Sequence, residues 1–111
     1  MVAYIPKRGD FIRLNFDPQA GHEQMGSRPA LVVSHTSFNR KMGFVFVCPV
    51  STTKRENPFY VTIPTGRKVA GVIMADQLRS LDYRARKAAF ISKCPEELLL
   101  EVLMRVEPIM L

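Results

Sequence analysis

Hydrophobic and polar residues alternate along much of this chain in the two-residue rhythm of half-buried β-strands. Residues 11–16 are the clearest case, because Ile12, Leu14 and Phe16 fall on one face of the predicted strand. Later runs have the same short length and are rich in β-branched and aromatic residues. They comprise residues 30–34, 44–48, 59–63 and 71–74, and residues 84–91 can supply one more. Residues 36–43 are polar and predict a turn or a short helix.

Only the end of the chain has the rhythm of a helix. Pro95 suits the first helical position, and Glu96 and Glu97 suit the positive end of the helix dipole. An apolar stripe at helical spacing follows. It consists of Leu99, Leu103, Val106 and Met110, and it is widened by Leu98, Val102 and Ile109. This broad face predicts that the helix contacts more than one surface.

Several short strands and one terminal helix predict a mainly β fold, a small and strongly curved β-barrel or sheet with a C-terminal helix. At 111 residues the chain, 1–111, is expected to form a single domain. Residues 44–48 are apolar on both faces. We expect the barrel to bury one face and a partner subunit to bury the other.

Composition narrows the class of protein. The N-terminus has no secretory segment, and no run approaches the roughly 18 apolar residues of a membrane span, so a cytoplasmic protein is expected. Cys48 and Cys94 match no zinc spacing and are expected to be free, buried thiols. Residues 1–94 carry fifteen Lys and Arg against six Asp and Glu, whereas residues 95–111 are acidic. This basic body predicts a polyanionic partner, either nucleic acid or an acidic protein.

Three polar clusters interrupt or follow the predicted strands. The first lies in a polar loop, residues 21–30, which has glycines that ease turning and which becomes rigid at Pro29. The clusters are His22, Glu23, Gln24 and Arg28; Ser51, Thr52 and Thr53 beside Lys54 and Arg55; and Asp76, Gln77 and Arg79, with Asp82 nearby. Taken singly, each has a structural explanation, since Glu23 can pair with Arg28, Ser51–Thr53 can form a turn, and Asp76 can accept from loop amides.

Together, the clusters have the residue types that cleavage of RNA without a metal requires. A base takes the proton of the 2′-hydroxyl, an acid protonates the leaving 5′-oxygen, and cations stabilise the charge on phosphorus oxygens. Arginine is a natural bidentate partner of phosphate, and serine or threonine hydroxyls can donate to it. His22 and His35 have no matching carboxylates at metal-ligand spacing, so neither a metal nor another cofactor is expected.

These residues also carry a family resemblance that spans nearly the whole chain. The run Gly21-His22-Glu23-Gln24, followed by Arg28-Pro29, resembles the MazF/PemK (Kid) toxins of bacterial type II toxin–antitoxin systems. Two later runs, Pro49-Val50-Ser51-Thr52 and Asp76-Gln77-Leu78-Arg79-Ser80-Leu81-Asp82, match in the same order.

The resemblance implies an SH3-like β-barrel of the PemK/MazF and CcdB-like type with a C-terminal helix, usually a homodimer. It implies an endoribonuclease that cleaves single-stranded RNA, often messenger RNA, by attack of the 2′-hydroxyl. It also implies an acidic, MazE-like antitoxin protein that blocks the RNA groove. An alternative is a non-enzymatic toxin on the same fold that poisons gyrase and uses its terminal helix. The Glu23-Gln24 and Arg28-Pro29 run favours the nuclease.

Site residues carry over position by position. The resemblance implies catalytic roles for Arg28, Ser51, Thr52 and Glu23. It implies RNA-binding roles for His22, Gln24, Thr53, Lys54, Asp76, Gln77 and Arg79. The PemK/Kid branch has an arginine two residues before the aspartate, where this chain has Met74, so that arginine's role does not carry over. The identities of the general acid and the general base stay open. Residues 17–27 and 51–58 are expected to select the RNA sequence.

Overall fold

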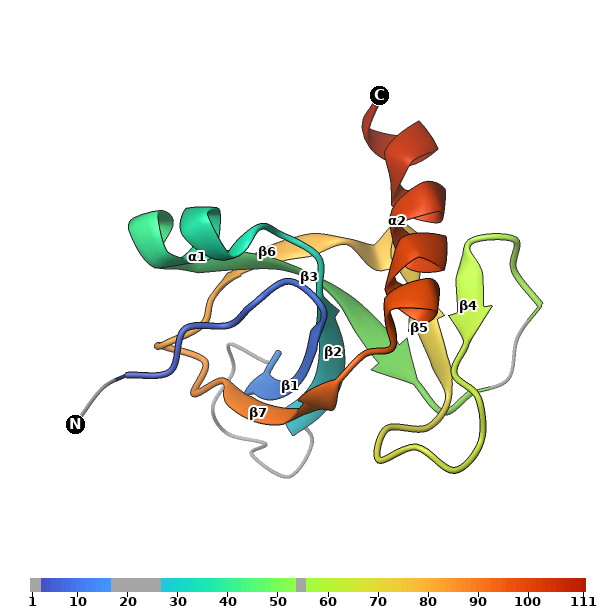
Figure 1. Ribbon diagram of the computed structural model, residues 1–111, viewed down its shortest axis with the longest axis horizontal. Helices are drawn as coiled ribbons and strands as arrows, with labels where there is room; N and C mark the ends of the chain where they lie inside the picture. Colours follow the sequence, from blue (N-terminus) through green and yellow to red (C-terminus); the bar gives the residue numbers. More distant parts are fainter. Residues whose placement is uncertain (1–2, 17–26, 54–55) are drawn as a thin grey trace.

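A computed structural model of the chain describes residues 3–16, 27–53 and 56–111 (Figure 1). The strands are β1 (Asp10–Asn15), β2 (Ser27–Val32), β3 (Phe44–Ser51), β4 (Tyr60–Thr62), β5 (Val72–Met74), β6 (Arg79–Asp82) and β7 (Ala89–Lys93). The helices are α1 (Thr36–Met42), the short 3-10 helix η2 (Ala75–Gln77) and α2 (Glu96–Met110). The predicted mainly β fold with a C-terminal helix is therefore confirmed, as is the short helix between the second and third strands.

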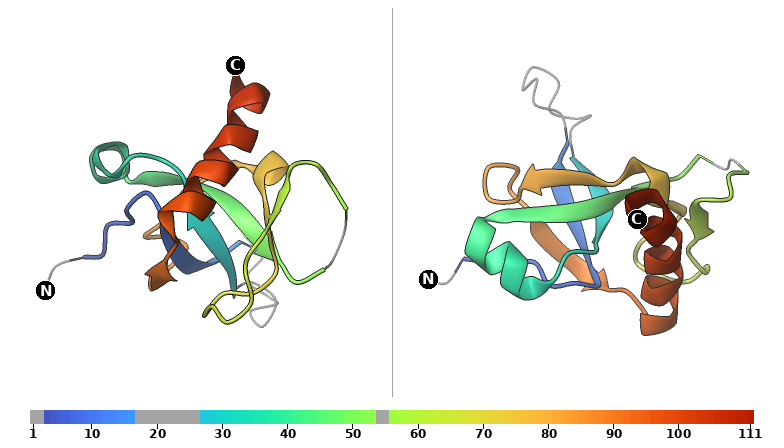
Figure 2. Two further views of the ribbon diagram at one scale, coloured as in Figure 1. Left: turned by 45° about the vertical axis from the view of Figure 1, so that its right-hand side comes forward. Right: turned by 90° about the horizontal axis from the view of Figure 1, so that it is seen from above.

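Strand β3 lies at the centre of a curved, antiparallel sheet. The sheet runs in the order β4-β5-β3-β2-β1-β7, and β6 also pairs with β3. One edge of β3 pairs with β2, while the other edge pairs with β6 along its first half and with β5 at its end. Helices α1 and α2 lie near opposite ends of this strand (Figures 1 and 2). Strand β3 therefore pairs directly with three other strands, β2, β5 and β6.

The two faces of β3 contribute to two hydrophobic clusters. Val45 and Val47 belong to what we call the strand cluster, while Cys48 and Val50 belong to the helix cluster. The strand cluster is Ile12, Leu14, Ala30, Val32, Val45, Val47, Leu81 and Tyr83. The helix cluster is Phe11, Leu31, Val33, Cys48, Val50, Val61, Ile63, Val69, Ile73, Ala75, Cys94, Leu98, Val102 and Val106.

This arrangement corrects the expectation that a partner subunit buries the second face of residues 44–48. The chain's own two clusters bury Val45, Val47 and Cys48 completely, because the strand cluster packs on one face of β3 and the helix cluster, which includes Leu98, Val102 and Val106 of α2, packs on the other. Phe44, at the start of the strand, remains 43% exposed.

Helix α2 differs from its prediction in two details. Pro95 is the N-cap residue, with an extended ψ of 143°, and the helix begins at Glu96. The buried positions are Leu98, Val102 and Val106. From the predicted stripe, Leu99 and Leu103 are only partly buried, and Met110 is 60% exposed. The helix packs a narrow face on the helix cluster, and its last turn extends past the barrel (Figure 1).

The segment from Arg79 to Lys93 also differs from its prediction. Residues 79–82 form strand β6, whereas the predicted strand 84–91 is a turn followed by β7. In that turn, Asp82 Oδ1 accepts hydrogen bonds from the backbone N–H groups of Arg84 and Ala85, both at 3.1 Å. Lys87 adopts a positive φ of 56°. The side-chain cap from Asp82 competes with strand formation and fixes the turn.

Both cysteines are free and buried, as predicted. Burial raises the pKa of the Cys48 thiol to about 12 and that of the Cys94 thiol to about 11. Both thiols therefore stay protonated near neutral pH and are poor nucleophiles. Within the described ranges, no helix is both long enough and apolar enough to cross a membrane.

Candidate functional site

Arg28 lies on strand β2, not in the preceding polar loop as predicted. It is held there because it pairs with Leu14 of β1, and its side chain is exposed. Strand β2 also pairs with β3, with Ala30 opposite Pro49. The β2–β3 pairing ends there, with Arg28 and Ser51 each two residues further along its own strand. Since residues two apart on a strand project to the same face, the guanidinium and the hydroxyl are directed to the same side of the sheet.

The hydroxyl groups at the end of β3 are available to a ligand. Ser51 is half-buried, whereas Thr52 and Thr53 are exposed. Ser51 Oγ accepts a hydrogen bond from the backbone N–H of Thr53 at 3.1 Å. Because that bond uses an oxygen lone pair, the hydroxyl proton remains free to be donated. Ser51 can thus donate to a bound phosphate oxygen.

Gly71 supports the backbone that carries these hydroxyls. Its φ of +119° is a conformation that favours glycine, and a Cβ at this position would lie 2.2 Å from the carbonyl oxygen of Ser51. Ser51 also pairs with Val72 of β5. The end of β3 is therefore fixed by the Gly71–Val72 backbone, while its pairing with β2 ends at Pro49.

Arg79 approaches the same end of the sheet from β6. It pairs with Val47 of the strand cluster, and its guanidinium carbon lies 5.2 Å from the centroid of the Phe16 ring. Phe16 directly follows β1 and packs against the strand cluster. The structure thus places a second cation, in cation–π contact, at the edge of the cluster that Arg28 and Ser51 border.

Asp76 and Gln77 lie on a different side. Both are exposed residues of η2, and this short helix packs beside α2. The negative charge of Asp76 acts on Cys48, where it adds to burial in raising the pKa of the thiol. Cys48 faces the helix cluster, whereas Ser51 follows the opposite face of β3. The contact of Asp76 and Gln77 with RNA therefore stays a prediction.

Four predicted site residues fall outside the described ranges. They are His22, Glu23, Gln24 and Lys54. Their roles therefore stay predictions from the sequence. In the described ranges, no group of three or more His, Cys, Asp and Glu residues is placed to hold a metal ion.

Arg86 contacts the entrance to the segment that carries His22–Gln24, and sequence reasoning gave it no role. Its Nη1 donates to the carbonyl oxygens of Asn15 at 3.3 Å and Phe16 at 3.1 Å. The backbone N–H of Asn15 donates to the Arg86 carbonyl at 3.0 Å. The turn capped by Asp82 thus fixes the positions of Asn15 and Phe16, the last described residues before position 17. No local pattern in the sequence marks this contact, because its acceptors are main-chain oxygens.

We expect Arg86→Ala to slow RNA cleavage about 10- to 100-fold, because small displacements of catalytic groups are costly. Millimolar guanidinium, well below denaturing concentration, is expected to restore part of the rate by occupying the vacated space. Cleavage rates with and without guanidinium provide the measurement. Arg84→Ala removes the same charge from an exposed position of the same turn and is the control. Equal losses in both variants, or no rescue, would contradict a positioning role.

The described part of the site is suited to binding a phosphodiester. Arg28 and Arg79 provide cationic donors, and Ser51, Thr52 and Thr53 provide hydroxyls, on a chain with a formal net charge of +6. Guanidinium groups form charge-assisted, often bidentate hydrogen bonds to phosphate oxygens. Fixed donors of this kind can also stabilise charge that grows on a phosphorus oxygen during reaction.

Comparisons with known proteins agree with this geometry. Residues 7–110 match the family described as PemK-like, MazF-like toxin of type II toxin–antitoxin system. The endoribonuclease toxin MazF of Escherichia coli K12 is 42% identical over 96 residues, which cover 86% of each chain. Endoribonuclease PemK of Escherichia coli is 36% identical over 108 residues, covering 94% of this chain and 81% of that protein.

Solved structures give the same result. The crystal structure of MazF from Deinococcus radiodurans superposes with a TM-score of 0.87 at 42% identity, covering 97% of this chain and 98% of that one. A MazE–MazF structure from the same organism gives a TM-score of 0.85 at 36% identity, with 97% of both chains covered. With a family match across residues 7–110 and relatives above 30% identity over most of its length, this chain belongs to the PemK-like, MazF-like toxins of type II toxin–antitoxin systems.

Proposed function

We propose that this protein is a toxin that cleaves single-stranded RNA, and messenger RNA in particular, as a metal-independent, sequence-specific endoribonuclease. The observation that carries the proposal is that strand alternation directs the exposed Arg28 of β2 and Ser51 at the end of β3 to the same side of the sheet. The relatives named above as endoribonucleases support the same reaction. They do not favour the alternative of a gyrase poison.

The reaction needs no covalent enzyme intermediate. The 2′-oxygen of one nucleotide attacks the adjacent phosphorus, a base accepts its proton, and the bond from phosphorus to the 5′-oxygen breaks. An acid protonates that leaving oxygen, so the products are a 2′,3′-cyclic phosphate and a 5′-hydroxyl end. Arg28 and Ser51 donate hydrogen bonds to the non-bridging oxygens as their charge grows. Glu23 and His22 are of the residue types that perform the proton transfers.

Purified protein incubated with mixed single-stranded RNA in excess EDTA is expected to cut it at a short preferred sequence. The new 5′ ends should accept a ligated adapter only after kinase treatment, because they carry a hydroxyl. Sequencing of adapter-ligated fragments, with and without kinase, measures both the position and the chemistry of the cut. Intact RNA, or cleavage that appears only when a divalent metal is added, would contradict the proposal.

The partner that inhibits this toxin is an acidic protein of the MazE class. A basic surface that holds RNA also attracts an acidic segment, so the two ligands compete for it. Solved relatives include complexes of MazF with MazE, which supports this assignment. Action on messenger RNA assigns the protein to the cytoplasm.

A homodimer is expected from the apolar side chains that the described surface leaves exposed. On α1 and the start of β3, Phe38 is 36% exposed, Met42 56% and Phe44 43%. We expect Phe44→Glu to convert a dimer into a monomer of 12.6 kDa, because a buried unpaired carboxylate opposes association. Light scattering at micromolar concentration measures the mass. Phe90→Glu, on β7, makes the same change at a residue that is 51% exposed and is the control. A wild-type monomer would contradict the prediction.

A further inference from the structure

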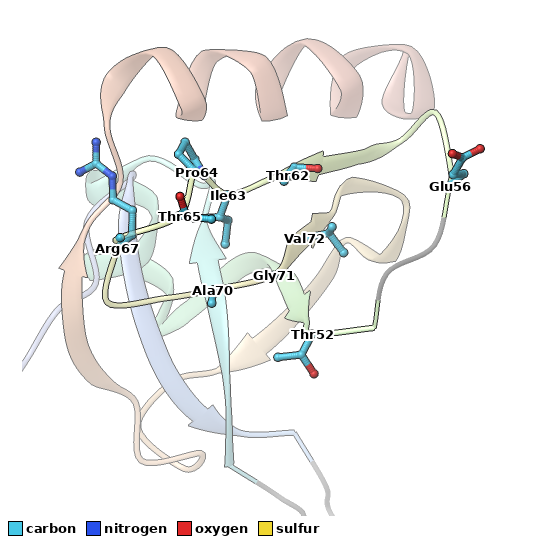
Figure 3. A pocket seen from close by; sticks show the side chains of 11 residues that line it. Thr52, Glu56, Thr62, Ile63, Pro64, Thr65, Arg67, Ala70, Gly71 and Val72 are labelled. Carbon is cyan, nitrogen blue, oxygen red and sulfur yellow. The ribbon is translucent and has the colours of Figure 1, made fainter.

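Two pockets lie at opposite edges of the sheet. One, of about 740 Å³, is lined by Thr52 and by residues of the β4–β5 edge, and it adjoins the candidate site (Figure 3). The other, of about 460 Å³, lies at the β1–β7 edge, and we call it the edge pocket. None of the candidate-site residues that the structure describes lines it. Its charged and aromatic lining consists of Tyr4, Lys7, Asp10, Arg40, Phe90 and Lys93.

A buried carboxylate organises the edge pocket. Asp10 is 2% exposed, and its Oδ2 accepts hydrogen bonds from the Tyr4 hydroxyl at 2.6 Å and from the backbone N–H of Lys7 at 3.0 Å. Its Oδ1 lies 3.8 Å from Lys93 Nζ and has no hydrogen-bond partner within the described part of the chain. A buried oxygen left without a hydrogen bond costs stability, and such departures concentrate at functional sites. Asp10 thus draws three lining residues together around the pocket.

Two aromatic rings form one wall of the edge pocket. The rings of Tyr4 and Phe90 meet edge to face, with centroids 6.4 Å apart and planes inclined at 65°. Tyr4 packs against the strand cluster, whereas Phe90 is 51% exposed. The Phe90 ring is therefore held by Tyr4 and remains accessible to a planar ligand. Bases of single-stranded nucleic acid stack on exposed rings of this kind where basic side chains lie beside them.

The edge pocket is also positively charged. Lys7, Arg40 and Lys93 are exposed, and among the described lining residues they stand against the single carboxylate of Asp10. Such a lining attracts anions. An acidic peptide would meet the cations but would leave the Phe90 ring without a stacking partner. A nucleotide uses both features, because its phosphate meets the cations while its base stacks on the ring.

The edge pocket lies one strand length from the candidate site. Asp10 and Asn15 are the two ends of β1, and five residues at a rise of about 3.3 Å separate them by about 17 Å. Asn15 pairs with Ser27, the neighbour of Arg28 on β2. An RNA strand that is cut beside Arg28 would need a few further nucleotides to reach the pocket, so any contact there is made outside the cleaved sequence.

We propose that the edge pocket is an RNA exosite, which binds a nucleotide of the substrate strand outside the cleaved sequence. The base stacks on Phe90, and a phosphate meets Arg40 and Lys93. The proposal rests on the proposed endoribonuclease function. It adds to that function a preference for long single strands, because the exosite strengthens binding of a longer RNA without taking part in the choice of the bond that is cut.

The test compares a short oligonucleotide, which holds only the preferred sequence, with oligonucleotides extended by unpaired nucleotides on the 5′ or the 3′ side. For the wild type, one extension should lower KM about tenfold, the size of one stacked base, and leave kcat unchanged. Phe90→Ala should lose this advantage and still cut the short oligonucleotide at the wild-type rate. Phe90→Trp, which retains a stacking ring, should keep the advantage.

Arg40→Ala tests the phosphate contact and keeps the proposal falsifiable should Phe90→Ala fail to fold. Each phosphate neutralised on a single strand contributes about 0.7 to the slope of log affinity against log salt concentration. For the extended oligonucleotide, this slope should therefore fall by about 0.7 in Arg40→Ala. Lys41→Ala is the matched control, because it removes the same charge from the next residue of α1, which is exposed and outside the lining. Its slope should equal that of the wild type.

Three results would overturn the exosite while leaving the proposed function intact. The first is equal KM values for the short and extended oligonucleotides in the wild type. The second is binding of a free nucleoside monophosphate that Phe90→Ala abolishes, without any effect of extension, which would favour a free nucleotide as the ligand. The third is weakened antitoxin binding in Phe90→Ala, again without an effect of extension, which would favour an acidic peptide. A wild type that cuts none of the oligonucleotides would instead refute the proposed function.

Discussion

Arg28→Ala is expected to lower the kcat/KM of RNA cleavage by about 100- to 1,000-fold, the usual cost of removing one donor aimed at developing charge. Arg28→Lys should recover only part of this loss, because an ammonium group cannot form the bidentate contact of a guanidinium. The thermal unfolding temperature should not change, since the Arg28 side chain is exposed. Initial rates on a cognate oligonucleotide, with melting curves alongside, measure both quantities.

Arg13→Ala is the control for this experiment. Arg13 is an exposed residue of β1, between Ile12 and Leu14, whose side chains belong to the strand cluster. Its side chain therefore projects from the opposite face of the strand. The variant removes the same charge, so it reports the general contribution of basic charge to RNA binding. Full activity of the Arg28→Ala variant would contradict the proposed site.

Gly71→Ala is expected to destabilise the fold by about 2–4 kcal/mol, in the upper range for single substitutions. The added Cβ would meet the Ser51 carbonyl oxygen at 2.2 Å, the Ser51 carbonyl carbon at 2.9 Å and the Thr52 Cα at 3.2 Å. Backbone atoms can retreat only if the end of β3 shifts. We therefore expect lost cleavage as well as a melting temperature lowered by about 10 °C or more.

Gly66→Ala is the control for Gly71→Ala, because it measures the cost of backbone strain without a steric clash. Gly66 also has a positive φ, +88°, but a Cβ there would meet nothing within 4 Å. Its cost should be about 1 kcal/mol, from the left-handed conformation alone. Equal melting temperatures for the two variants would show that the close approach at Ser51 has no energetic importance.

Local patterns predicted the elements well. Alternation within residues 11–16 identified β1, and the polarity of residues 36–43 predicted a turn or a short helix where α1 lies. The sequence did not reveal β6, because Leu81 is the one buried residue in its four and the rest is polar. It also could not tell which part of the broad apolar face of α2 is buried. That choice depends on where the helix meets η2 and β4.

The candidate site was predictable as a set of residue types but not as an arrangement. That Arg28 and Ser51 face the same side of the sheet follows from the pairing of β2 with β3, and no local pattern specifies this register. The Arg86 side chain donates a hydrogen bond to the carbonyl oxygen of Phe16, which lies 70 positions away in the sequence. The acceptor is a main-chain atom that every residue possesses. Contacts of that kind leave no trace in one sequence.

The two clusters on either side of β3 have a consequence for how such a protein can evolve. Arg28, Ser51 and Arg79 border the cluster built from strands, whereas α2 closes the other. The outward side of α2, away from the buried Leu98, Val102 and Val106, bears Leu100 and Met104, and neither belongs to either cluster. Substitutions there can accumulate without disturbing either cluster, while the chemistry of cutting is inherited intact. Duplicated copies of the gene can in this way diverge on one face of the protein without first losing their toxicity.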